Sequence, residues 1–285
     1  MDFLLRKRNI LRLRFVSSAL HDASSTKSDS QKTFYEKAVS SILQSSPNFK
    51  RFRRIYNYRE IVETVTYKQG QECLERIATL GLPLTSDFSR YFLNDSVGMP
   101  TKYRYPNVGR ISPTTLRYVS IALELKKLFG NNLNGSFVEI GAGYGGQAAV
   151  LMEFFQISDY GIYDLVEVQE LTLRFLTRVG KAKNLSLHSL SENSNQNWNL
   201  VISNYAFSEL PAELQKEYIQ KVLSKSERGY LIMNSGMTNR SGRSNGKLTL
   251  EQLRAVLPEF EIFEEIPNTG PDNYVIAWGH NRVAG

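Results

Sequence analysis

The sequence predicts an α/β fold in which a mostly parallel sheet of seven strands ends in an antiparallel hairpin and follows a helical N-terminal region. Beyond Gly135, short β-rich runs alternate with helical stretches, which is typical of a parallel sheet covered on both faces. The last two β-rich runs are joined by only a short turn-rich link, so we expect them to pair antiparallel. From Lys32 to about Leu80, apolar residues recur at three- and four-residue steps with few Gly or Pro, which indicates helices.

The chain divides into three expected parts. Residues 1–30 form a basic arm, residues 31–112 form a helical and loop region that we expect to act as a substrate lid, and residues 113–285 form the sheet domain. The end of the second part is dense in residues that break helices and strands, which predicts a long irregular connection. The breakers are Gly81, Pro83, Gly98, Pro100, Pro106, Gly109 and Pro113.

The elements of the sheet domain follow one another in a regular order. Strands are expected at residues 137–140, 160–163, 185–187, 200–203, 230–233, 261–266 and 274–278, and helices at residues 114–129, from residue 146 onward, and at residues 166–179, 211–223 and 250–257. The last helix has the clearest signals, because Thr249 and Gln252 form a capping box at its start and Pro258 follows its end.

The composition is that of a globular protein. With 285 residues, of which 41% are hydrophobic, the chain can fill a large core. The single cysteine, Cys73, excludes a disulfide framework, and the three histidines lie too far apart for a zinc-ligand spacing, so we predict no metal site. No apolar run approaches the roughly 20 residues that cross a bilayer. We therefore expect a soluble protein in a reducing compartment, the cytoplasm.

The net charge of +7 is concentrated at the N-terminus. Residues 1–60 contain 13 Lys and Arg against 5 Asp and Glu, whereas residues 61–285 contain 22 against 23. A nearly neutral body does not favour a nucleic-acid substrate, since nucleic-acid enzymes usually surround the substrate with positive charge. The Arg- and Ser-rich start also has the composition of a mitochondrial transit peptide, so a mitochondrial location is the alternative to a basic arm in the cytoplasm.

The most informative segment is FVEIGAGYGG, a buried strand that enters a glycine-rich turn and then a helix. Gly141 and Gly143 let a ligand approach the main chain closely, as nucleotide sites require. The G-x-G-x-x-G spacing also fits a nicotinamide dinucleotide, but Glu139 would repel its pyrophosphate and suits the positive groups of S-adenosylmethionine. Asp164, 23 residues after Gly141, can accept the ribose hydroxyl hydrogens of either cofactor. A tight turn without a ligand is the third interpretation.

Three segments together resemble a known enzyme family. EIGAGYGG with the strand that ends at Asp164, then NLVISNYAFSELP, then GYLIMNSG, is similar to the class I S-adenosylmethionine-dependent methyltransferases, and in particular to the sugar O-methyltransferase group. The resemblance covers about residues 97–285 and implies a Rossmann-like sheet and a cofactor, S-adenosylmethionine. It implies that the cofactor is held by Glu139, Gly141, Gly143, Tyr144, Gly145, Asp164 and Asn204.

A sugar hydroxyl must lose a proton when it is methylated, so we expect a general base within reach of the methyl group. Ligands of a doubly wound sheet lie outside the carboxyl ends of its parallel strands. Glu209, just after the fourth strand, is therefore the first candidate, with Asp272 and Tyr205 as the others. Glu209 can equally be a helix-start acid that is stabilised by the helix dipole.

Aromatic and cationic side chains interleave in the region just before the first sheet strand. Aromatic faces stack on sugar rings and guanidinium groups hold phosphates, so this region favours a nucleotide-sugar or a glycan as substrate. The expected substrate residues are Tyr103, Arg104, Arg110, Arg117 and Tyr118. The alternatives are an RNA or other small-molecule methyltransferase, and a methyltransferase-like assembly factor that no longer catalyses.

Overall fold

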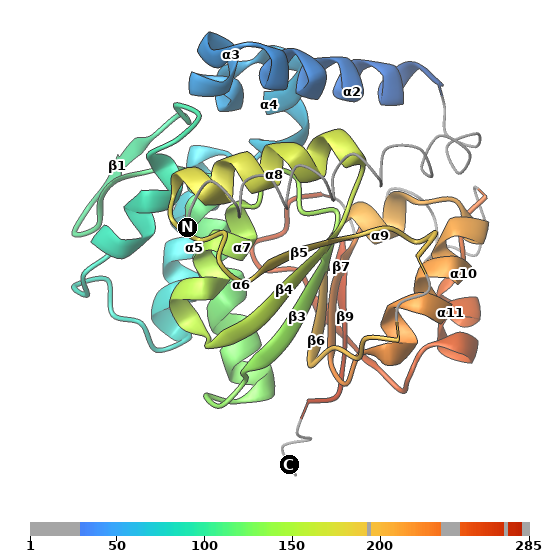
Figure 1. Cartoon of the computed structure of the whole chain (residues 1–285). Coiled ribbons are helices and arrows are strands. Elements are labelled where there is room, and N and C mark those ends of the chain that lie inside the picture. Colours follow the sequence, from blue (N-terminus) through green and yellow to red (C-terminus); the bar gives the residue numbers. More distant parts are fainter. Residues whose placement is uncertain (1–28, 193–194, 235–245, 271–272, 281–285) are drawn as a thin grey trace.

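The computed structural model describes residues 29–192, 195–234, 246–270 and 273–280 (Figure 1). Most of the predicted basic arm therefore lies outside the described residues, although residues 29 and 30 open the first described helix. No helix in these four ranges is both long enough and apolar enough to span a bilayer.

Seven strands of the described chain form one twisted sheet, which confirms the predicted fold class (Figure 1). Their order across the sheet is β5-β4-β3-β6-β7-β9-β8, and the first five pair in parallel. The last strand, β9, lies between β7 and β8 and pairs antiparallel with both. The strands are β3 (Gly135–Ile140), β4 (Ile157–Tyr163), β5 (Leu185–His188), β6 (Leu200–Asn204), β7 (Gly229–Met233), β8 (Glu261–Glu264) and β9 (Tyr274–Trp278).

The strand order reverses between β3 and β6. From β3 the chain builds outward through β4 and β5, and then returns to the other side of β3 to form β6 and β7. In an open α/β sheet, ligands bind outside the carboxyl ends of the strands at such a switch point. A ligand is therefore expected beside the residues that follow β3, β4 and β6.

Helices cover both faces of the sheet, because side chains alternate between the faces along each strand. Phe137, Ile162 and Ile202 pack in one core against helices α6 (Pro113–Phe129), α7 (Gly146–Phe154) and α8 (Val166–Arg178). Val138 and Val201 pack in the second core against α10 (Ala212–Lys221) and α11 (Leu250–Val256). Figure 1 shows α10 and α11 together on one side of the strands.

The helical N-terminal region belongs to the first of these two cores. It consists of α2 (Asp29–Gln44), α3 (Ser46–Lys50), the 3-10 turn η2 (Phe52–Arg54), α4 (Tyr56–Val62) and α5 (Tyr67–Thr79). α5 packs along α6 and α2 packs along α8, with α2 and α3 above the sheet in Figure 1. The buried residues Val39, Tyr58 and Ile77 share one continuous core with the sheet.

Residues 81–113 are more regular than the sequence predicts. The segment forms a 3-10 helix, η3 (Ser89–Asp95), and a two-stranded hairpin of β1 (Tyr103–Tyr105) and β2 (Gly109–Ile111). The hairpin turn is closed by Asn107 and Gly109, both at positive φ (63° and 102°). The prediction of an irregular connection was wrong here because three-residue strands are too short to give a periodic pattern among the breakers.

A buried arginine joins the N-terminal region to the rest of the molecule. Arg53 is fully buried, and its Nε donates to Glu63 at 2.6 Å while its Nη1 donates to Asp95 at 3.1 Å. Its Nη2 donates to the Ser112 hydroxyl that caps α6. The guanidinium also lies 4.8 Å from the centre of the Tyr144 ring, within the glycine-rich turn. This cation therefore connects η2, α4, η3, α6 and the turn after β3.

Candidate active site

The turn after β3 has a conformation that only glycine adopts easily. Gly141, Gly143 and Gly145 have φ values of 78°, 58° and 86°, in the left-handed region. A Cβ atom on Gly141 would collide with the Cβ of Ala206, the first residue of the short helix α9 (Ala206–Glu209). The main chain after β3 thus passes directly beside the main chain after β6.

Asp164 closes this turn from the end of β4. Its Oδ2 accepts a hydrogen bond from the Gly143 amide at 3.1 Å, and its Oδ1 accepts one from the Leu165 amide at 2.8 Å. The Thr172 hydroxyl in α8 donates to the Gly143 carbonyl at 2.7 Å. The structure therefore brings two predicted cofactor residues, 21 positions apart, into direct contact.

Glu139 is buried in the middle of this arrangement. Its side chain is 1% exposed, and its Oε2 accepts a 2.7 Å hydrogen bond from the Tyr160 hydroxyl. Burial raises the pKa of Glu139 to about 8, although the bond from Tyr160 and the nearby Arg117 act to lower it. A carboxylate was expected here from the sequence, whereas burial favours the protonated form of Glu139 in the free protein at neutral pH. A cation bound beside it would favour the charged form.

Tyr144, which the resemblance assigns to the cofactor, directs its ring into the core. The ring is fully buried and packs edge-on against Phe52 and Phe175, at 5.4 and 4.8 Å between ring centres. Its hydroxyl has no hydrogen-bond partner among the described residues. Only the main chain of Tyr144 belongs to the turn. Val62, at the end of α4, covers the turn from above, since a Cβ on Gly143 would lie 3.3 Å from its Cγ1.

Asn204 ends β6 and offers an unused acceptor. Its Nδ2 is 3.5 Å from Oε1 of Gln147 in α7, while its Oδ1 is buried without any hydrogen-bond partner among the described residues. A buried acceptor without a donor costs free energy unless a ligand or water satisfies it. This atom at the switch point is therefore a candidate ligand contact.

Tyr205 follows Asn204 and holds an unusual backbone conformation. Its φ and ψ are 69° and −36°, a region that residues with a side chain rarely enter and that is commonest at functional sites. Its hydroxyl accepts a 3.1 Å hydrogen bond from Nη1 of Arg117, in α6, and donates to the carboxylate of Glu265. Thr269 lies 2.7 Å from the same hydroxyl. Burial, together with Glu265, raises the pKa of Tyr205 to about 12 although Arg117 opposes this, so the phenol keeps its proton at neutral pH.

Glu265 and its neighbours form a hydrogen-bonded group that was not predicted from the sequence. Besides Tyr205, the buried Glu265 carboxylate accepts hydrogen bonds from the Thr269 amide and hydroxyl and from Nδ2 of Asn273, each at 2.9 to 3.0 Å. These residues lie in the link between β8 and β9, which the sequence indicates only as turn-rich. The position of this link could have indicated a site, because the start of an antiparallel last strand lies at the carboxyl ends of the parallel strands.

The remaining predicted residues are spread over the molecule. Glu209 is exposed at the end of α9, and Asp272 lies outside the described residues. Arg104 and Arg110 face each other across the β1–β2 hairpin and are exposed, whereas Tyr118 is buried in the first core. The structure thus brings Arg117 to Tyr205 and leaves the hairpin arginines at the surface.

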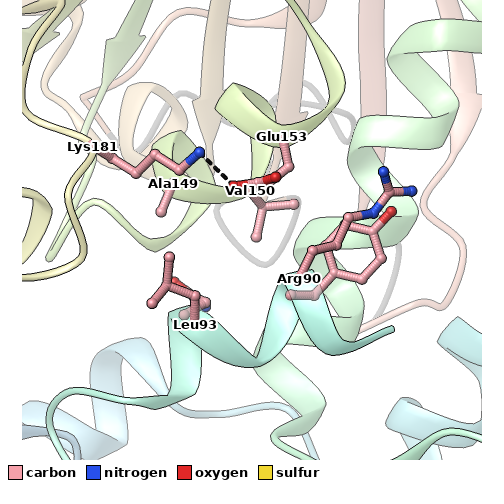
Figure 2. Close-up of a pocket in the computed structure, with 8 residues that line it drawn as sticks. Arg90, Leu93, Ala149, Val150, Glu153 and Lys181 are labelled. Atoms are coloured by element: carbon pink, nitrogen blue, oxygen red, sulfur yellow. Dashed lines mark ion pairs between the residues drawn. The ribbon is translucent and has the colours of Figure 1, made fainter. Parts of the chain in front are cut away.

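A small pocket lies apart from the glycine-rich turn and from the hydrogen-bonded group of Arg117, Tyr205, Glu265 and Thr269. Figure 2 shows a small pocket where Arg90 and Leu93 of η3 face Ala149 and Glu153 of α7, with Glu153 ion-paired to Lys181. None of the predicted site residues lines this pocket. In the described ranges, no group of three or more His, Cys, Asp and Glu side chains is arranged to hold a metal ion.

Comparison with known proteins finds structural but not sequence matches. The sequence matches no protein-family model and no curated protein. The structure is similar to that of the mitomycin 7-O-methyltransferase MmcR, with a TM-score of 0.42 and 11% identity over 57% of this chain, and the chain spans 56% of that protein.

Two other solved structures are similar to the same extent. One is an S-adenosylmethionine-dependent methyltransferase from Clostridium acetobutylicum ATCC 824, with a TM-score of 0.43 and 10% identity over 56% of this chain and 88% of that one. The other is magnesium protoporphyrin IX methyltransferase from Synechocystis PCC 6803 with bound SAH, with a TM-score of 0.42 and 12% identity over 56% and 80%. All three are methyltransferases by name, and their substrates and cofactors are properties of those proteins.

Proposed function

We propose that this chain transfers the methyl group of S-adenosylmethionine to a hydroxyl group of a sugar. The observation that carries the proposal is the contact between the glycine-rich turn and Asp164, with the Gly143 amide 3.1 Å from the carboxylate at the switch point of the sheet. The resemblance in sequence supports the donor and the sugar class. When bound, the donor supplies an electrophilic methyl carbon that is already activated by the sulfonium.

The residues of the switch point fit this donor. Asp164 can accept hydrogens from vicinal ribose hydroxyls, as a carboxylate at the end of the second strand does in nucleotide sites. Asn204 Oδ1, which has no partner among the described residues, can accept a hydrogen bond from an ammonium group. The positive charge of a bound donor near Glu139 would favour the ionised form of this carboxyl group. Gly141 and Gly143 adopt positive φ values, so the turn can hold a backbone conformation that residues with a side chain rarely adopt.

The chain must also take up the proton of the acceptor hydroxyl. We assign this step to Glu209, whose exposed carboxylate ends α9, the short helix that follows β6. Tyr205 is the poorer base, because its phenol is already protonated and donates to Glu265. A general base of this kind accelerates proton removal by about 10²–10⁴-fold.

Calorimetry and mass spectrometry test the proposal. S-adenosylmethionine and its demethylated product should bind, a nicotinamide dinucleotide should not, and Asp164→Ala should weaken donor binding in a chain that still unfolds cooperatively in urea. A panel of sugars and nucleotide-sugars incubated with isotopically labelled donor should yield a labelled methyl ether. Dinucleotide binding without donor binding would refute the cofactor assignment.

Glu209→Gln tests the base. Turnover should fall by about 10²–10⁴-fold with donor affinity unchanged. The matched control is Glu213→Gln, which changes another exposed acid, in the first turn of α10, that pairs with Lys216. A fall of less than threefold in Glu209→Gln would move the assignment to Asp272.

A further inference from the structure

The guanidinium of Arg117 is a buried cation with unused hydrogen-bond donors. The residue is 9% exposed, and its surroundings raise its pKa although burial alone would lower it, so the group is charged. Among the described residues, no carboxylate lies within 4.0 Å of it, and only the Tyr205 hydroxyl accepts a hydrogen bond from it. Its Nε is enclosed without a partner. A buried charge without a carboxylate partner costs free energy unless a counter-ion binds beside it.

The surrounding residues hold this guanidinium in one orientation. Nη1 is fixed by Tyr205, whose hydroxyl is in turn held by Glu265 and Thr269. The aromatic rings of Tyr118 and Tyr205 lie 5.6 and 5.3 Å from the guanidinium carbon. With Nη1 occupied, the edge formed by Nε and Nη2 is left, and this edge has the two parallel donors that match a carboxylate.

Arg117 lies close to the switch point of the sheet, between the glycine-rich turn and the residues that follow β6. The neighbouring Tyr118 touches the glycine-rich turn, since a Cβ on Gly146 would lie 2.6 Å from its ring, and its carbonyl accepts from Gln147. Tyr205 directly follows Asn204, and Arg117 is near enough to Glu139 to lower the pKa of that carboxyl. Arg117 therefore lies against Tyr205, the residue after Asn204, and one residue before the tyrosine that touches the glycine-rich turn.

We propose that Arg117 binds a carboxylate group of a ligand at the switch point through its Nε and Nη2 edge. This inference rests on the proposed function, because that function supplies the ligands: the carboxylate belongs either to the methionine half of the donor or to an acidic sugar acceptor. Glu265 does not take this role, since the Tyr205 phenol lies between its carboxylate and the guanidinium. Tyr205 and Glu265 are positioning residues for Arg117.

The first arm of the test changes the ligand and leaves the protein intact. Calorimetry compares S-adenosylhomocysteine with its decarboxylated analogue, which keeps the adenosine, the thioether and the amine. If the carboxylate comes from the donor, loss of it should weaken binding to the wild-type chain by about ten- to a hundred-fold, as for other hydrogen bonds to charged groups. Arg117→Met should bind both compounds with the affinity of the analogue, and Arg117→Lys should recover only part of the difference.

The second arm tests the acceptor as the source. With the donor product bound, D-glucuronate is compared with D-glucose as a probe on wild-type and Arg117→Met chains. If the acceptor supplies the carboxylate, the wild type should bind glucuronate at least tenfold more tightly than glucose, and Arg117→Met should lose this preference. Arg76→Met is the matched control, because Arg76 lies in α5 and pairs with Glu124 away from the switch point.

The outcomes separate this inference from the proposed function. If the wild type fails to bind S-adenosylhomocysteine at all, the proposed function is refuted. If it binds that compound and the decarboxylated analogue equally, and prefers glucuronate no more than glucose, the carboxylate role of Arg117 is refuted while the methyl-donor site stands. Both comparisons use the wild-type chain, so a failure of Arg117→Met to fold does not affect them.

Discussion

Glu139→Gln separates the electrostatic cost of a buried carboxyl group from its use in the site. Burial raises the pKa of Glu139 from 4.5 to about 8. The pKa of Glu139 in the folded state therefore lies above its value in the unfolded state. At a pH between these two pKa values, the folded chain holds a proton on Glu139 that is released on unfolding. Its stability relative to the Gln variant is accordingly greatest below about pH 4.5 and falls as the pH rises toward 8.

The size of the effect follows from the two pKa values. At pH 7, the wild type should be less stable than a chain with a residue that never ionises at this site by about 3 kcal/mol. Between pH 5.5 and 7.5, its free energy of unfolding should fall by roughly 2–3 kcal/mol, whereas that of Glu139→Gln should not. Glutamine suits the comparison, because it keeps the size of the side chain and an oxygen that can accept the hydrogen bond from Tyr160.

Urea unfolding at these two pH values, without donor, measures the effect. Glu251→Gln, at an exposed position in α11, serves as the control and should follow the wild type. Calorimetry on the same samples should show that Glu139→Gln binds S-adenosylmethionine more weakly although it is the more stable chain at pH 7.5. Parallel pH dependences for the wild type and Glu139→Gln would show that Glu139 is not protonated in the folded protein, and would refute the reasoning.

Three other substitutions or reactions probe the same framework. Gly141→Ala places a Cβ against Ala206 at a φ of 78°, so we expect a loss of about 1–3 kcal/mol in urea unfolding together with loss of donor binding. Arg53→Met leaves Glu63 and a second buried carboxylate without their cation and should cost about 3–5 kcal/mol, whereas an unchanged midpoint would contradict the buried ion cluster. Cys73 is fully buried, which raises its pKa to about 12, so a thiol reagent at pH 8 should modify it only after unfolding.

At neutral pH the Tyr205 phenol keeps its proton, because burial raises its pKa to about 12. The phenol donates its proton to Glu265 and receives a hydrogen bond from Arg117, so both of its hydrogen-bonding functions are engaged. The strained backbone of Tyr205 persists because these contacts fix the side chain. We therefore propose that Tyr205, directly after β6, orients Arg117 and that another residue acts as the base.

Much of the fold could be predicted because its signals are local. The alternation of strands and helices, the capping box at Thr249 and the glycine-rich turn depend on residues close together in sequence, and the observed elements agree with the predicted ranges to within a few residues. The hairpin of β1 and β2 was not predicted, because strands of three residues are too short to give a periodic sequence pattern.

Local sequence patterns were enough to predict the sheet, the place of the glycine-rich turn and the position of Asp164 at the end of the second strand. The packed structure was needed to show that burial raises the pKa of Glu139, that the ring of Tyr144 lies in the core, and that Arg117 contacts Tyr205, 88 positions further along the chain. The reason is physical: periodicity and turn chemistry act over a few neighbouring residues, whereas desolvation and the pairing of distant polar groups exist only after the helices have packed on the sheet.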